Sequence, residues 1–131
     1  METMQTAPIP TELTRIDDPL MLPLEMTVRE AAQQMHSRNI SAVLVMDAGD
    51  VLVGIFTQRD AVSRVLAARK DPDATVLGDV MTANIHTISA DYTVEEALRL
   101  TEECRCRHLP IVAGRKVIGL LSRCDLRIRV P

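Results

Sequence analysis

The sequence predicts an α+β fold in which two similar halves each contain a strand, a helix, two strands and a second helix. The first observation behind this prediction is an internal repeat, because the spacing Gly49-x4-Gly54 returns 65 residues later as Gly114-x4-Gly119. The second is a Thr-x-x-Glu capping box in each half, and the third is a pair of β-branched runs after each box. We therefore expect two βαββα halves related by a pseudo-two-fold axis, with their short sheets packed together and their helices outside.

The repeat divides the chain into three segments. Residues 1–12, rich in Thr, Pro and Met, are expected to be a flexible lead-in. Residues 13–73 form the first half and residues 74–131 the second. A half of this size buries too little surface to be stable alone, so we expect each half to bury an apolar face against the other. The cleft between them is then the expected place for a ligand.

Each element of the first half has a local signal. Thr27 precedes Glu30 by three residues, which predicts a capped helix ending near residue 38. The expected strands are residues 20–22, 41–46 and 51–56. Asp47-Ala48-Gly49-Asp50 has the composition of a hairpin turn between the last two strands. A second helix is expected from Thr57 to about Ala68, because Asp71-Pro72-Asp73 would break it.

The second half repeats these signals. Thr93 and Glu96 predict a capped helix that ends near residue 104. The expected strands are residues 85–88, 109–112 and 117–121. The final helix has only residues 126–130 before Pro131, so it is expected to be short or truncated.

Composition limits the classes of function. The chain has 131 residues, a net charge of −3 and 2% aromatic residues, so it lacks the cationic surface and the stacking platforms that nucleic-acid binding needs. Residues 101–131 are locally cationic, which suits a small anionic partner. No apolar run is long enough for a membrane helix, and residues 1–10 lack a secretion signal. The three cysteines, all in the last third, fit free thiols, so we expect a soluble, cytoplasmic protein.

A hydroxyl and a carboxylate recur three residues apart after each glycine-led strand. They are Thr57 and Asp60 in the first half and Ser122 and Asp125 in the second. In one interpretation the pair caps the following helix, which stabilises it by about 0.5–2 kcal/mol. In the other, the carboxylate accepts hydrogen bonds from a vicinal diol such as a ribose, while the hydroxyl and free amides face a phosphate. The duplication favours the second interpretation and leaves the first open.

Five motifs give the second half a resemblance to a known family. In chain order they are Asp79-Val80-Met81-Thr82, His86-Thr87-Ile88, Thr93-Val94-x-Glu96-Ala97, Arg107-His108-Leu109-Pro110-Ile111-Val112 and Gly119-Leu120-Leu121-Ser122-x-x-Asp125. Together they resemble a cystathionine β-synthase (CBS) motif. Residues 13–70 resemble another such motif with a weaker start. The chain is therefore similar, over nearly its whole length, to a CBS pair or Bateman module.

The resemblance implies a non-catalytic regulatory module. Such a module binds an adenosine-containing ligand, such as AMP, ADP, ATP or S-adenosylmethionine, in two pseudo-symmetric clefts. The resemblance implies no required cofactor and no metal. It also implies a homodimer that controls an attached or partner protein, because ligand occupancy changes the population of module arrangements.

The resemblance also implies roles for individual residues. In the first cleft Asp60 would hold the ribose, and Thr57 the ribose or a phosphate. The adenine cage there would be Met21, Ile40, Ala42 and Ile55, with backbone groups near Ser41 reading the base edge. The second cleft would use Asp125 and Ser122, with Thr87, Cys106, His108 and Leu120 around the base. Arg107 and His108 would reach the phosphates of the ligand held by Thr57 and Asp60.

The first half departs from the family's pattern at its start. Met21 takes the position that Thr87 holds in the second half, and Ser41 and Ala42 are the uncharged counterparts of Arg107 and His108. We therefore expect the first cleft to bind weakly or to take a different base, and the two clefts to differ in phosphate preference.

Two alternatives remain open, and one is excluded. A CBS pair can act as a ligand-free dimerisation scaffold. Cysteines and a histidine could instead supply soft zinc ligands, against the simpler reading of buried, inert thiols; these are Cys104, Cys106, His108 and Cys124. A P-loop is excluded, because Ile55-Phe56 and Leu120-Leu121 follow the glycine pairs where Lys and Ser/Thr are required.

Overall fold

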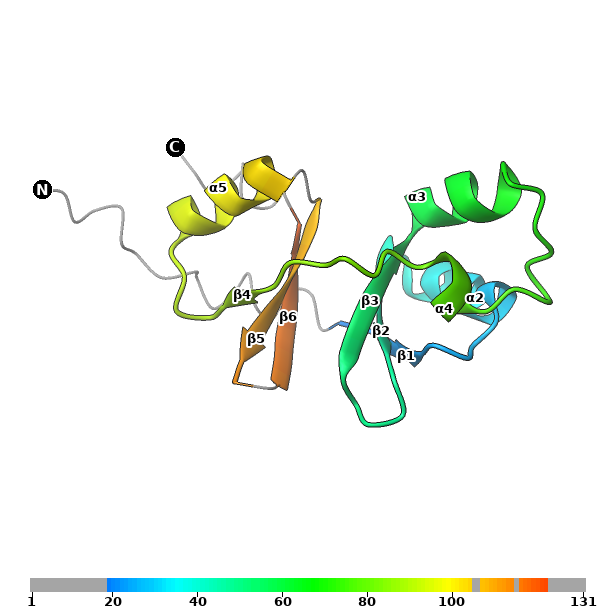
Figure 1. Cartoon of the computed structure of the whole chain (residues 1–131), viewed down its shortest axis with the longest axis horizontal. Coiled ribbons are helices and arrows are strands. Elements are labelled where there is room, and N and C mark those ends of the chain that lie inside the picture. Colours follow the sequence, from blue (N-terminus) through cyan, green and yellow to red (C-terminus); the bar gives the residue numbers. More distant parts are fainter. Residues whose placement is uncertain (1–18, 105–106, 115, 123–131) are drawn as a thin grey trace, which may run out of the picture. The chain divides into compact units, whose positions relative to one another are not determined.

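The computed structural model describes residues 19–104, 107–114 and 116–122. These residues fall into two compact units that divide between Ile85 and His86 (Figure 1). Both units combine helices with one three-stranded sheet, which confirms the predicted α+β class. The predicted final helix at residues 126–130 and the lead-in at residues 1–12 lie outside the described residues.

The sheet of the first unit has the strand order β1-β2-β3. Its strands are β1 (Met21–Pro23), β2 (Ala42–Met46) and β3 (Leu52–Thr57). Strand β1 runs parallel to β2, and β2 runs antiparallel to β3. The helices of this unit are α2 (Val28–Arg38), α3 (Gln58–Asp60), the π-helix η2 (Ala61–Leu66) and α4 (Leu77–Val80).

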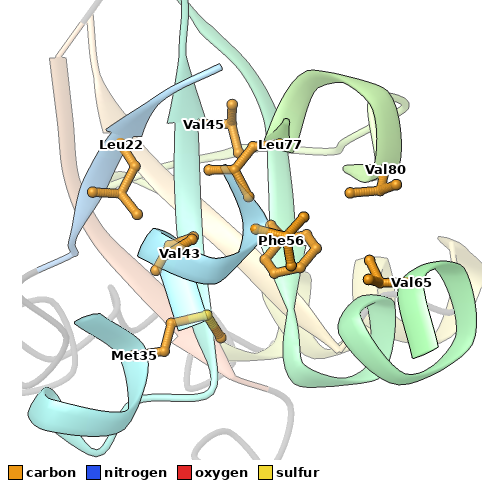
Figure 2. Packing of buried hydrophobic residues seen from close by; sticks show 10 residues of the cluster. Leu22, Met35, Val43, Val45, Phe56, Val65, Leu77 and Val80 are labelled. Carbon is orange, nitrogen blue, oxygen red and sulfur yellow. The ribbon is translucent and has the colours of Figure 1, made fainter. Parts of the chain in front are cut away.

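The core of the first unit lies between the sheet and its helices. Val43 and Val45 of β2 and Phe56 of β3 are fully buried and belong to one cluster. Figure 2 shows side chains from the helices gathered around Phe56. They include Met35 from α2, Val65 from η2, and Leu77 and Val80 from α4. Helix α2 therefore buries one apolar stripe against the sheet, as its spacing predicts.

The second unit repeats this arrangement. Its elements are β4 (Ile88–Ser89), α5 (Val94–Cys104), β5 (His108–Ala113) and β6 (Lys116–Ser122). The strand order is β4-β5-β6, with β4 parallel to β5 and β5 antiparallel to β6. Ile88, Leu109, Ile111 and Leu121 form its core together with Ala97 of α5.

Both predicted capping boxes are confirmed. The Thr27 amide donates to Glu30 Oε1 at 3.3 Å, and the Glu30 amide donates to Thr27 Oγ1 at 3.2 Å. At the start of α5, the Thr93 amide donates to Glu96 Oε1 at 2.8 Å and the Glu96 amide donates to Thr93 Oγ1 at 3.0 Å. The first helix of each half thus begins where the Thr-x-x-Glu pattern predicts.

The hairpin turn between β2 and β3 is also confirmed. Asp47 Oδ1 accepts hydrogen bonds from the amides of Gly49 at 2.8 Å and Val51 at 3.0 Å. Asp50 has a positive φ of 59°, a conformation that Asp tolerates better than most residues. An aspartate that bonds its own backbone is a usual way to stabilise such a turn.

Three elements differ from the sequence prediction. The strand predicted at residues 85–88 begins only at Ile88, and the helix predicted from Thr57 to Ala68 is a short α3 followed by the π-helix η2. Helix α4 was not predicted. It forms because the Leu77 amide donates to Met26 O, the Gly78 amide donates to Leu24 O, and the Leu77 side chain is fully buried. These contacts are tertiary, so local sequence signals do not reveal them.

The segment after Asp73 therefore packs on the first unit. The Val28 amide at the start of α2 donates to Thr75 O at 2.8 Å, and Thr82 forms a β-bridge with Ile55. The compact units consequently divide at residue 85, later than the repeat boundary at residue 73. No helix in the described ranges is both long and apolar enough to cross a membrane.

Candidate ligand site at the end of strand β3

Thr57 and Asp60 meet at the end of β3, where the helical segment begins. The Thr57 amide donates to Asp60 Oδ2 at 3.0 Å, and the Asp60 amide donates to Thr57 Oγ1 at 3.1 Å. The pair is thus a reciprocal capping box, as the simpler of the two sequence interpretations predicts. The box leaves most of the hydrogen-bonding capacity of the carboxylate for other donors, because an ionised carboxylate has about four acceptor sites.

Two further side chains approach the same carboxylate. The Thr82 hydroxyl donates to Asp60 Oδ1 at 3.3 Å and lies 3.5 Å from Oδ2. Arg64 Nε lies 3.6 Å from Asp60 Oδ1, one helical turn further along. Asp60 is only 8% exposed, whereas carboxylates are seldom buried without partners. The site therefore holds a largely buried negative charge beside one cation and two hydroxyl groups.

Cross-strand register places three of the four predicted cage residues, Met21, Ala42 and Ile55, on one face of the sheet. Ala42 is the partner of Thr57, Leu44 is the partner of Ile55, and Met21 is the partner of Leu44. Partners share a face because side chains alternate along a strand. The core residues Val43 and Phe56 point to the other face, toward α2.

The three predicted cage residues on this face are apolar and differ in exposure. Ala42 and Ile55 are 6% and 7% exposed, whereas Met21 is 45% exposed. Leu44 lies in the middle of the same face and is fully buried. The sheet thus brings Met21, Ala42 and Ile55 to the face from which Thr57 also projects.

Ile40 and Ser41 precede β2, and each makes a backbone hydrogen bond. The Ile40 amide donates to Met35 O at 3.0 Å and so closes the C-terminal turn of α2. Ser41 O accepts from the Gln58 amide at 2.9 Å. This hydrogen bond joins the residue before β2 to the first residue of α3.

The second unit carries the counterpart of this face. His108 is the partner of Ser122, and Pro110 is the partner of Leu120. Leu120 is buried, whereas Thr87 and Arg107 are exposed. Cys106 and Asp125 lie outside the described residues, so the structure describes only some of the residues predicted for the second site.

Three residues of the first candidate site were not predicted from the sequence. Leu44 could have been found from strand alternation, because it lies two positions after Ala42. Arg64 lies four residues after Asp60, which is a helical spacing that brings opposite charges together. Thr82 is 22 residues from Asp60, and nothing local connects the two.

The described residues contain no group of three or more His, Cys, Asp or Glu side chains that could hold a metal ion. Two residues of the zinc hypothesis, Cys106 and Cys124, are not among the residues that this search covered. Zinc binding therefore stays an alternative from the sequence, beside the expectation of no metal.

Known proteins are similar to this chain along most of its length. The model of the CBS domain family matches twice, over residues 12–67 and 77–131. A CBS domain-containing protein of Arabidopsis thaliana is 36% identical over 108 residues, which are 82% of this chain and 19% of the plant protein. Hypoxic response protein 1 of Mycobacterium tuberculosis is 30% identical over 105 residues, which are 80% of this chain and 73% of that protein. The chain thus spans about a fifth of the length of the plant relatives.

Solved structures agree with these matches. A CBS-domain protein of Burkholderia ambifaria has a TM-score of 0.78 and 32% identity, with 85% of this chain and 81% of the other covered. The crystal structure of Hypoxic Response Protein I, which holds two coordinated zinc ions, has a TM-score of 0.76 and 25% identity, with 90% and 96% covered. Both family-model matches and both sets of relatives lead to one conclusion: this chain belongs to the CBS domain family and contains a tandem pair of CBS domains.

Proposed function

We propose that the chain is a non-catalytic regulatory module that binds an adenosine-containing ligand, such as AMP, ADP, ATP or S-adenosylmethionine. The observation that carries the proposal is the largely buried Asp60 carboxylate, which lies next to an apolar sheet face. A carboxylate recognises the diol of a ribose, and an apolar face accepts the flat base. Membership of the CBS domain family supports the same proposal.

In the proposed complex the ribose hydroxyls donate to Asp60. Only the contact from the Thr57 amide, at 3.0 Å, has the length of an ordinary hydrogen bond. The Thr82 contacts at 3.3 and 3.5 Å are longer than typical O–H···O bonds. If ribose hydroxyls replace the Thr82 hydroxyl at Asp60, they form charge-assisted hydrogen bonds, and only a long, weak contact is lost.

The neighbouring groups complete the site. The base would pack on the face formed by Met21, Ala42 and Ile55, which the sheet register places together. Thr57 Oγ1 accepts from the Asp60 amide and still has its own proton to donate to the ribose or a phosphate. The corresponding second site would use Ser122 and Asp125, with Thr87, Cys106, His108 and Leu120 near the base.

Ligand occupancy would then act by population shift. A ligand that binds one arrangement of the module better than another stabilises that arrangement by its difference in affinity. The module would thereby control an attached or partner protein. The chemistry needs no reacting group on the protein, because sensing requires only this difference.

We also propose that the chain forms a homodimer. Val62 and Leu66 lie four residues apart on η2 and are 57% and 68% exposed, although both are large apolar residues. Apolar side chains at helical spacing on a surface are typical of a helix that packs against a partner. A CBS-CP12 protein from bloom-forming cyanobacteria that has the same fold is hexameric, at a TM-score of 0.82, 22% identity, and 92% and 70% coverage.

A second candidate function is a ligand-free dimerisation scaffold. The observation that favours it is the geometry of Thr57 and Asp60, which repeats the purely structural capping boxes of Thr27 and Thr93. If capping is the whole role of Asp60, no ligand is needed to explain its position.

Calorimetric titration with AMP, ATP and S-adenosylmethionine separates the two candidates. The Asp60→Asn variant keeps an acceptor for the Thr57 amide but loses the charge, so micromolar binding should weaken by roughly ten- to a hundredfold. Glu30→Gln, the matched change in the box that starts α2, should leave the affinity unchanged. Equal affinities in the wild type and in Asp60→Asn, or no heat with any of the three ligands, would remove the proposed role of Asp60.

A further inference from the structure

The segment that leads from the first unit to the second is fastened to strand β3 next to Asp60. The Ile55 amide donates to Thr82 O at 3.0 Å, and the Thr82 amide donates to Ile55 O at 2.8 Å. Figure 1 shows this green segment crossing β3 on its way from α4 to β4. Arg64 adds a second attachment, because its Nη1 donates to Met81 O at 2.9 Å.

The Asp60 carboxylate contacts one residue from each attachment, Thr82 and Arg64. Its Oδ1 accepts from the Thr82 hydroxyl and lies 3.6 Å from Arg64 Nε. The same carboxylate therefore serves the cap of the helical segment and the anchoring of residues 81–82. A group that donates to both carboxylate oxygens therefore competes with these partners for the same acceptor atoms.

The lengths and positions of the contacts determine which partner leaves. The Thr57 amide donates to Oδ2 at 3.0 Å, the Thr82 hydroxyl faces both oxygens at 3.3 and 3.5 Å, and Arg64 Nε, at 3.6 Å from Oδ1, is beyond hydrogen-bond distance. A ribose diol that donates one hydrogen bond to each oxygen needs the two atoms that the Thr82 hydroxyl faces. The Thr82 contact is the one to lose, because it is uncharged and long, whereas Arg64 brings charge and the Thr57 amide is fixed by the backbone.

We infer that Thr82 is a coupling residue whose hydroxyl competes with the ligand for Asp60, so that an occupied site loosens the attachment of residues 81–82 to β3. The inference rests on the proposed function, because it assumes that a diol binds at Asp60. It deepens that function by naming the contact through which binding reaches the segment between the two units. By linkage, the attachment must weaken ligand binding by the same factor as the ligand weakens the attachment.

Amide hydrogen exchange on the ligand-free full chain tests the attachment. The Thr82→Val variant keeps the shape and the extended backbone but removes the hydroxyl donor. Protection of the Ile55 amide, which donates to Thr82 O, should fall by about three- to tenfold. The Leu44 amide, bonded to Leu20 O, is the internal reference and should not change. Unchanged protection at Ile55 overturns the attachment.

Calorimetric titration with AMP tests the competition. Thr82→Val should bind AMP about three- to tenfold more tightly than the wild type, because the ligand no longer displaces a partner. A merely structural Thr82 would leave the affinity equal or lower, and that result overturns the inference. Thr27→Val, which removes the hydroxyl of the α2 cap, is the matched control for lost stability and should not change the affinity.

The two measurements separate the possible failures. If the inference holds, saturating AMP abolishes the difference in Ile55 protection between the wild type and Thr82→Val. If neither protein binds AMP, ATP or S-adenosylmethionine, the proposed function fails and the competition with it. In that case amide hydrogen exchange on the ligand-free protein still shows whether the Thr82 hydroxyl stabilises the attachment of residues 81–82 to β3.

Discussion

At the residue scale, burial separates Asp60 from the other carboxylates that cap helices in this chain. Glu30 and Glu96 form the same reciprocal bonds with a threonine three residues before them, but both are exposed. Asp60 is buried, and its carboxylate also contacts the Thr82 hydroxyl and the Arg64 guanidinium. Burying a charge is costly, and a cap alone does not require it. The extra partners offset this cost, and the ligand-binding role of Asp60 is the proposal that the experiments below test.

Close packing against residues 81–82 explains why position 54 of β3 is a glycine. A Cβ at this position would lie too close to Met81 Sδ, and only 2.9 Å from both Met81 Cγ and Thr82 O. The flexible side chain can move, but Thr82 O is held by the Ile55 amide. We predict that Gly54→Ala lowers the free energy of unfolding by about 1–3 kcal/mol, as measured by urea denaturation.

Gly49 provides the control for this substitution. The nearest atom to a Cβ there is Asp47 Oδ1 at 3.5 Å, an ordinary contact distance. Gly49→Ala should therefore stay within about 0.5 kcal/mol of the wild type. An equal loss of stability in both variants would show that close approach to the 81–82 segment is not the reason for Gly54.

At the element scale, the start of α2 is clamped to the turn that follows η2. Arg29 Nε donates to Asp73 Oδ1 at 2.7 Å, and the Arg29 amide donates to Pro72 O at 3.0 Å. The hydrogen bond from Arg29 lowers the pKa of Asp73 below its usual value. Both side chains are exposed, so the clamp is open to screening by salt.

The clamp predicts a pH-dependent stability. Since the folded-state pKa of Asp73 is lowered, its contribution is present above the unfolded-state pKa of about 3.9 and is lost as the pH falls through the folded-state value. Urea denaturation should show Asp73→Asn less stable than the wild type at pH 7 and equal to it well below pH ~3.9. The difference should also shrink in about 1 M salt. A difference that persists in acid and in salt would assign the effect to the backbone turn instead.

The elements that the sequence predicted correctly are those with a local cause. The caps at Thr27 and Thr93 and the Asp47 turn all depend on residues within four positions of each other. Helix α4 and the Thr82 contact depend on partners far away in the chain, so no local pattern indicates them. The internal repeat pointed to Thr57 and Asp60, but only the folded chain shows Arg64 and Thr82 beside them.

At the scale of the whole molecule, the repeat preserves the register of both sheets. Ala42 pairs with Thr57 in the first unit, and His108 pairs with Ser122 at the same place in the second. The shared register keeps a hydroxyl residue at the end of each third strand. It also places an apolar residue, Ile55 or Leu120, two positions before it. A duplicated site is therefore expected from the duplicated fold.

Self-association is predicted at this scale. Light scattering after size-exclusion chromatography should give twice the 14.5 kDa of the single chain. Replacing both Val62 and Leu66 with Asp should yield the monomer, because like charges and lost apolar area oppose helix pairing. Val51→Asp changes a residue that is similarly exposed, in the β2–β3 hairpin, and should remain dimeric. A wild-type monomer, or a double variant that stays dimeric, contradicts the proposed η2 interface.

In the proposed complex the Asp60 carboxylate binds the hydroxyls of a ribose. The most direct test is a double-mutant cycle that compares AMP with 2′-deoxy-AMP on the wild type and on Asp60→Asn, with each affinity measured by calorimetry. If Asp60 binds the ribose, loss of the 2′-hydroxyl should weaken binding to the wild type by about tenfold or more and change binding to Asp60→Asn far less. Equal losses in both proteins would show that Asp60 does not bind the sugar.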